Sequence, residues 1–189
     1  MNPAVTNLVI MLVMMQVSKK IDFDDPTVTL AVRILYVTSN VLIFGLYFWT
    51  KTKIEKKNDL TTLKYVEAPS AFSGTSESKL VTTTVKEYDL QQVNTAIKGS
   101  FSGIAMMAFM HLYMKYTNPL LIQSLLPFKS AIEQNIVQIH IFGKAATGDL
   151  KRPFKAASMF GAQPGGDVRT DKKTISEAEK AGSGGVKED

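Results

Sequence analysis

Four polar side chains recur at helical spacing inside the most apolar part of the sequence. They are Arg33, Tyr36, Asn40 and Tyr47, at relative positions 0, 3, 7 and 14. This spacing places them on one face of a helix. An arginine within a membrane helix is costly, so Arg33 is a functional candidate by default. The alternative is that Arg33 extends its side chain to the membrane surface, towards Asp22 or Asp25.

Further polar residues interrupt the other apolar stretches. They are Asn7, Gln16, His111 and Lys115. Together with the helix face that carries Arg33, these residues could line a hydrated groove within the membrane. Such a groove would open to the cytosol. Lys115 lies near the end of its stretch, where a lysine more often reaches out to the interface. A lone histidine such as His111 is more often packed or hydrogen-bonded than a ligand.

Methionine is concentrated in two of the apolar stretches. Seven of the nine methionines lie there: Met11, Met14, Met15, Met106, Met107, Met110 and Met114. Three of them, Met107, Met110 and Met114, recur at positions i, i+3 and i+7 and predict one helical stripe. Flexible methionine side chains suit surfaces that bind varied partners. The alternative is ordinary packing between membrane helices.

Basic residues form two clusters outside the apolar stretches. The first is Lys51, Lys53, Lys56 and Lys57, and the second is Lys144, Lys151, Arg152 and Lys155. Such clusters favour anionic lipid headgroups or ribosomal RNA as contacts. Neither cluster carries an aromatic RNA-reading motif, so recognition would depend on charge and shape. The alternative is that these charges only orient the chain in the membrane.

Composition argues against most enzyme chemistries. The 189 residues include no cysteine and only two histidines, and no pair of carboxylates has the spacing of an acid/base dyad. We therefore predict no catalytic residue, no metal site and no cofactor. The function classes that remain are binding, scaffolding, transport and functions within a membrane. The mean hydropathy of +0.03 and the net charge of +5 are averages over very different segments.

Three apolar stretches must position these residues: 3–17, 28–49 and 101–126. The second has 22 residues with one charge and ends in an aromatic cluster, as a spanning helix does. The third fits a span from residue 100 to about 116. The first is short, and it could be a signal-peptide core, a tilted span or an interfacial helix. It lacks a basic leader and a small-residue cleavage site, so we expect a retained membrane helix.

The lysines after the second stretch predict that this side is cytosolic. Residues 1–50 then form a helical hairpin of two membrane helices with an acidic, non-cytosolic turn. We expect 51–98 to be a cytosolic loop, with a β-hairpin from 63–67 and 80–86. An amphipathic helix with a capping box at Asp89 and Gln92 would follow. We expect 99–142 to hold the third membrane helix plus a re-entrant or amphipathic segment, with a plain fourth span as the alternative.

Residues 143–189 complete the chain as a basic flexible tail, with a short helix near 173–181. The side of the membrane on which this tail lies stays open, because an odd number of spans and its own lysines favour opposite sides. The predicted fold class is an all-α integral membrane protein. It has about three transmembrane helices, a small mixed cytosolic segment and a largely disordered C-terminal tail.

Several runs in order resemble a fungal endoplasmic-reticulum membrane family. They are MLVMMQ at 11–16, DPT at 25–27, RILY at 33–36, KYVE at 64–67, HLYMKYTNPL at 111–120, TGDLKRPFK at 147–155 and TDKK at 170–173. The family is the third component of the SRP-independent targeting route, and it is also named for inorganic phosphate transport. The resemblance covers nearly the whole chain. It implies a multi-pass endoplasmic-reticulum protein that delivers or inserts membrane proteins. No site residues are transferred to this chain from the resemblance.

The implied partners are the Sec translocon, the ribosome, other membrane components of the route, nascent membrane-protein clients and lipids. With this role, the candidate client-facing residues are Arg33, Tyr36, Asn40, His111, Met11, Met14, Met107, Met110 and Met114. One alternative is a phosphate transporter or a transporter-assembly factor, although a carrier should show an internal repeat and none is visible. A passive structural subunit of a translocon complex is a third possibility.

Overall fold

The computed structural model describes residues 3–67, 79–154 and 175–176. The chain divides into two compact units. The helical unit comprises Met1–Lys57 and Asp89–Lys144, and the hairpin unit comprises Asn58–Tyr88 and Ala145–Asp189.

The helical unit begins with α1 (Pro3–Ser18) and α2 (Pro26–Lys57). The start of α2 is fixed by Asp25, whose carboxylate accepts a hydrogen bond of 2.7 Å from the backbone N–H of Thr27. Pro26 follows directly, with a ring that suits the first turn of a helix. The last two turns of α2 carry the first lysine cluster. These lysines therefore lie on a helix, whereas the sequence predicted that they belong to a loop.

The third apolar stretch does not form one continuous helix. The helix α3 (Val85–Ala108) ends in a π-helical turn at Phe109–Tyr113, and the chain reverses before α4 (Asn118–Glu133). Two local features explain the reversal: Lys115 has a left-handed backbone with φ of 62°, and Pro119 occupies the first turn of α4. Helical structure therefore covers residues 100–113 of the segment predicted as the third span, and the chain reverses at its end. The short helix α5 (Asn135–His140) follows α4.

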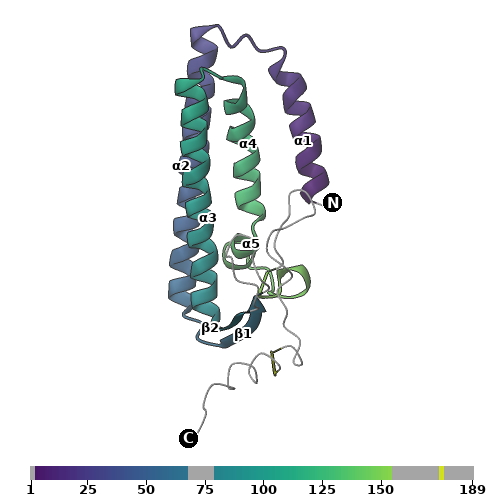
Figure 1. Cartoon of the computed structure of the whole chain (residues 1–189), viewed down its shortest axis with the longest axis vertical. Coiled ribbons are helices and arrows are strands. Elements are labelled where there is room, and N and C mark those ends of the chain that lie inside the picture. Colours follow the sequence, from purple (N-terminus) through teal and green to yellow (C-terminus); the bar gives the residue numbers. More distant parts are fainter. Residues whose placement is uncertain (1–2, 68–78, 155–174, 177–189) are drawn as a thin grey trace, which may run out of the picture. The chain divides into compact units, whose positions relative to one another are not determined.

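The helix α4 packs against both α1 and α2 and lies between them (Figure 1). The expected hairpin of α1 and α2 thus has a third helix inserted, and 119–142 is a packed part of the bundle. The core of this region is formed by Val32, Met107, Leu120 and Leu121, with Met14, Ile21, Phe23, Tyr36 and Met110 packed around it. Because this core joins residues near the α1–α2 loop to residues near the α3–α4 turn, both connections lie at the same end of the unit.

Among the described residues, α2 is the one helix that is long and apolar enough to cross a membrane. The apolar part of α1 is shorter, and 16 residues rise only about 24 Å, against roughly 30 Å of hydrocarbon. The outward faces of α1 and α2 carry exposed Leu and Val side chains. The protein is therefore mostly helical with one candidate membrane helix, and the expectation of three spans is not confirmed.

The hairpin unit contains the expected strand pair. Strands β1 (Thr62–Glu67) and β2 (Lys79–Thr84) are antiparallel, with Thr62 opposite Thr84. The helix α3 starts directly after β2, so its capping box is formed by Thr84 and Glu87 instead of the predicted Asp89 and Gln92. Asp89 is almost completely buried within the helical unit and contacts His140 at 2.7 Å.

The segment that follows the 3₁₀ turn η2 (Gly148–Leu150) packs within the hairpin unit. The Phe154 N–H donates a 2.7 Å hydrogen bond to the Tyr88 hydroxyl, and the two rings meet edge to face. The ring of Tyr65 on β1 also meets the Tyr88 ring edge to face. Phe154 of the predicted flexible tail is thus docked on Tyr88. The predicted helix at 173–181 lies outside the described residues except for 175–176.

Candidate functional site

Arg33 and His111 form a direct hydrogen bond between α2 and the π-helical turn. The Arg33 Nε donates to the His111 Nε2 at 3.0 Å, and the His111 Nδ1 lies 3.0 Å from the Tyr116 carbonyl oxygen. An Nε2 that accepts and an Nδ1 that donates define a neutral imidazole. The sequence singled out both residues, and the structure brings them together although 78 positions separate them.

The π-helical turn explains how His111 reaches this position. The Met114 N–H bonds to the Phe109 carbonyl five residues back, and the Tyr116 N–H bonds to the Met110 carbonyl. A turn with one extra residue is often found at functional positions in helices. His111 is only 9% exposed, whereas its partner Arg33 is exposed.

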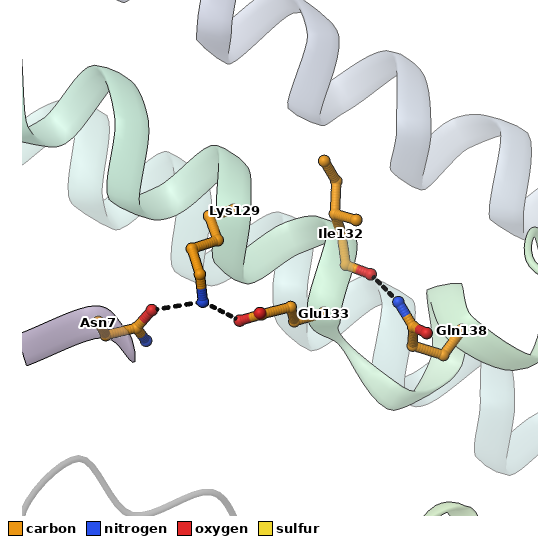
Figure 2. Close-up of polar contacts among 5 residues, drawn as sticks. All are labelled: Asn7, Lys129, Ile132, Glu133 and Gln138. Atoms are coloured by element: carbon orange, nitrogen blue, oxygen red, sulfur yellow. Dashed lines mark hydrogen bonds and ion pairs between the residues drawn. The ribbon is translucent and has the colours of Figure 1, made fainter. Parts of the chain in front are cut away.

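A second polar contact joins α4 to α1 (Figure 2). The Lys129 ammonium donates to the Asn7 side-chain oxygen at 2.8 Å and forms an ion pair with Glu133 one helical turn further along. The side chains of Lys129 and Glu133 are 22% and 36% exposed. A charged pair is therefore held, partly shielded, between two helices whose other surfaces are largely apolar.

Backbone polar groups of α4 find partners in its neighbours. Pro127 lies inside the helix, and the absence of its N–H removes one helical hydrogen bond. Near this point the Ser39 hydroxyl of α2 donates to the Ser124 carbonyl. After the break at Gln134, the Gln138 side-chain amide donates to the Ile132 carbonyl at 2.6 Å (Figure 2). Such partners allow an interrupted helix to exist in apolar surroundings.

The polar face predicted on α2 is divided by the structure. Tyr36 packs against the core, Tyr47 is buried, and the Asn40 amide donates to the Tyr36 carbonyl of its own helix. Of the residues on this predicted face, only Arg33 has an exposed side chain. Among the other predicted polar residues, Gln16 and Lys115 are exposed, and Asn7 joins the contact with Lys129.

The predicted methionine stripe is also divided. Met107 is buried at 4% exposure, and Met110 and Met14 pack around the same core. Met11 and Met114 are exposed. Met107 and Met110 contact the same core, as their spacing predicts, whereas Met114 follows the π-helical turn at Phe109–Tyr113 and is exposed.

The two basic clusters differ in position. Lys53, Lys56 and Lys57 are exposed at the end of α2, and Lys51 is half-buried. Lys144 belongs to the helical unit, but Lys151 and Arg152 belong to the hairpin unit. The Arg152 guanidinium lies 5.9 Å from the centre of the Phe154 ring, and Lys155 lies outside the described residues.

Several site residues were missed by the sequence analysis. Lys129 and Glu133 were not among the candidate residues, although their i, i+4 spacing is typical of a helical ion pair. The buried contact between Asp89 and His140 had no local signal, because 51 positions separate them. Within the described ranges, no group of three histidines or carboxylates is arranged to hold a metal ion.

The chain is similar to known proteins over nearly its whole length. The family model described as "Phosphate transport (Pho88)" matches residues 1–186. The chain is 56% identical over 187 residues to "SRP-independent targeting protein 3" of Saccharomyces cerevisiae, with 99% of each chain covered. It is 44% identical over 179 residues to "SRP-independent targeting protein 3 homolog" of Schizosaccharomyces pombe, covering 94% of this chain and 91% of the relative. No solved structure matches the chain.

Proposed function

The chain belongs to the Pho88 family, and from that membership we propose that it is a non-enzymatic, insertase-like factor of SRP-independent targeting. The expected resemblance to this family is confirmed. We further propose that the protein is a multi-pass protein of the endoplasmic-reticulum membrane. The names of the relatives support the role in targeting, and the apolar helix α2 supports the membrane location.

The observation that carries this proposal is the charged contact of Lys129, Glu133 and Asn7 between α4 and α1. A client protein that enters the membrane must move a polar flank through hydrocarbon, where each unpaired polar group costs several kcal/mol by order of magnitude. Partly exposed ammonium, carboxylate and amide groups offer that flank hydrogen-bond partners on the way. Arg33 and His111 supply a second pair of polar side chains for this purpose in the same unit.

Apolar parts of a client require a different surface. We propose that the exposed Met11 and Met114 contact client helices, and that the packed Met14, Met107 and Met110 let the neighbouring helices adjust. The lysines at the end of α2 are proposed to contact lipid headgroups or the ribosome. The Sec translocon and the other components of the route are the proposed membrane partners.

Reconstitution with a short-tailed membrane client tests the proposal. Full-length protein in liposomes should raise the insertion rate of a client that has a charged flank. We expect Lys129→Met to lower this rate about tenfold, which corresponds to about 1.4 kcal/mol of lost transition-state stabilisation. Arg33→Leu should also lower the rate. The matched control is Lys98→Met, because Lys98 is an exposed lysine on α3 of the same unit.

A client with an uncharged flank separates the groove mechanism from general damage. Its insertion should change little in Lys129→Met, since there is no flanking charge to accommodate. Equal insertion by liposomes with and without the wild-type protein would contradict insertase activity and favour a structural subunit. Uptake of phosphate by the same liposomes, in the absence of client, would favour the transport function in the family name.

A further inference from the structure

The guanidinium of Arg33 has more hydrogen-bond donors than the protein uses. Its Nε donates to His111, and the four remaining N–H groups are carried by the two terminal nitrogens. Within the described part of the chain, no other hydrogen bond or ion pair involves Arg33. The side chain is nevertheless exposed on an apolar helix, where an unpaired positive charge is unfavourable.

The carboxylates expected to neutralise Arg33 serve other purposes. Asp22 accepts a hydrogen bond of 3.1 Å from the backbone N–H of Asp24. Asp25 accepts one of 2.7 Å from the backbone N–H of Thr27, at the start of α2. Since His111 is neutral in its observed hydrogen-bonding pattern, the pair of Arg33 and His111 keeps one full positive charge.

The surroundings of Arg33 are those of a membrane interface. Its neighbours Leu30, Ile34 and Val37 on α2 are exposed over more than half of their surface. On the turn that carries His111, Tyr113 and Tyr116 are also exposed. Tyrosines are enriched where hydrocarbon meets headgroups. Arg33 follows the start of α2 by seven residues, which is about 10 Å of helical rise.

We propose that Arg33, oriented by His111, binds a phosphate group at the end of the helical unit where α2 begins. A guanidinium presents parallel N–H donors that match two phosphate oxygens, and a lysine cannot reproduce this fork. The hydrogen bond to the buried His111 ring holds the guanidinium in place before the ligand arrives, which lowers the entropy lost on binding. The phosphate belongs either to a phospholipid headgroup or to inorganic phosphate, and both offer the same oxygen atoms.

Native mass spectrometry of the delipidated full-length protein in detergent tests the site. The probes are dioleoylphosphatidylcholine, dioleoylglycerol with the same acyl chains but no phosphate, and inorganic phosphate. We expect one phosphate-dependent ligand per chain, retained several-fold better than dioleoylglycerol. Arg33→Lys should reduce this retention several-fold, and Arg33→Gln should abolish it. Lys98→Gln, which removes an exposed lysine of α3 that belongs to neither basic cluster, should leave it unchanged.

His111→Leu gives a second test that keeps the arginine. It removes the acceptor for the Arg33 Nε, so retention should fall although the positive charge remains. Binding of inorganic phosphate that displaces the lipid identifies the free anion as the ligand, and retention of the lipid against inorganic phosphate identifies the headgroup. Equal retention of dioleoylglycerol, or full retention in folded Arg33→Lys and Arg33→Gln, would overturn the site. No client protein is needed, so the result is independent of insertion activity.

Discussion

Arg33 and Lys129 are two positive charges in the helical unit, and their neighbours balance them differently. Lys129 has Glu133 one turn away on its own helix, whereas Arg33 meets a neutral histidine from another segment. A pair at i, i+4 can be found by inspection of the sequence. The contact of Arg33 with His111 could not, because it depends on a π-helical turn that has no clear sequence pattern.

At the residue scale, Glu87 allows a prediction about pH. The pKa of this exposed carboxyl lies below its ordinary value of 4.5, chiefly because the carboxylate accepts the Thr84 backbone N–H and also the Thr83 hydroxyl. A lowered pKa in the folded state means that the cap stabilises the start of α3 above pH 4.5. This stabilisation is lost as the pH falls through the lowered pKa. An NMR titration of the Thr84 amide should therefore show a midpoint below 4.5.

Glu87→Gln is the control for this titration. A glutamine at this position of a capping box still accepts a hydrogen bond but does not ionise in this range. The Thr84 amide should then show no acid transition, while α3 still begins at Val85. A midpoint at or above the ordinary carboxyl value in the wild-type protein would contradict the role of the cap.

At the scale of elements, α4 shows that an apolar stretch of sequence does not determine where one helix ends and the next begins. The sequence predicted a helix from 100 to 116 and an ambiguous segment after it. Composition could not place the chain reversal, because it depends on the left-handed backbone of Lys115. The Ser39 hydroxyl of α2 donates to the Ser124 carbonyl, and this contact has no local sequence signal because 85 positions separate the two residues.

The contact between α2 and α4 gives a prediction for this element. Ser39→Ala removes the donor to the Ser124 carbonyl and leaves that buried group without its interhelical partner. We expect a loss of about 1 kcal/mol in unfolding free energy, as for other hydrogen bonds between membrane helices. Thermal unfolding in detergent measures the change. Thr38→Ala, on the exposed side of the same turn, should have little effect, and equal losses in the two variants would argue against the contact.

For the whole molecule, the sequence was most informative about the family and the individual elements. It was least informative about how the helices pack against one another. The strand pair, the helix α2 and the family were predicted, because each has a strong local pattern or many matching runs. The insertion of α4 between α1 and α2 was not predicted, since packing between distant segments leaves no periodicity in a single sequence. The contact of Phe154 with Tyr88 was not predicted for the same reason.

The arrangement of the helical unit makes a prediction about membrane topology that the absence of cysteine makes easy to test. Because the chain has no native thiol, a single introduced cysteine is a unique label. Asp24 lies in the α1–α2 loop and Lys115 lies in the α3–α4 turn, and the core near Met107 places both connections at one end. Glu55 is exposed near the opposite end of α2.

In sealed microsomes, a membrane-impermeant maleimide should label Glu55→Cys from the cytosolic side, since the neighbouring lysines favour that side. Asp24→Cys and Lys115→Cys should be labelled only after the membrane is permeabilised. Protection of both Asp24→Cys and Lys115→Cys is the informative result. It requires the α3–α4 turn to lie on the same side of the membrane as the start of α2. Labelling of Asp24→Cys and Lys115→Cys from opposite sides would contradict the packing of the core. Labelling of all three from the cytosol would mean that α2 does not cross the membrane.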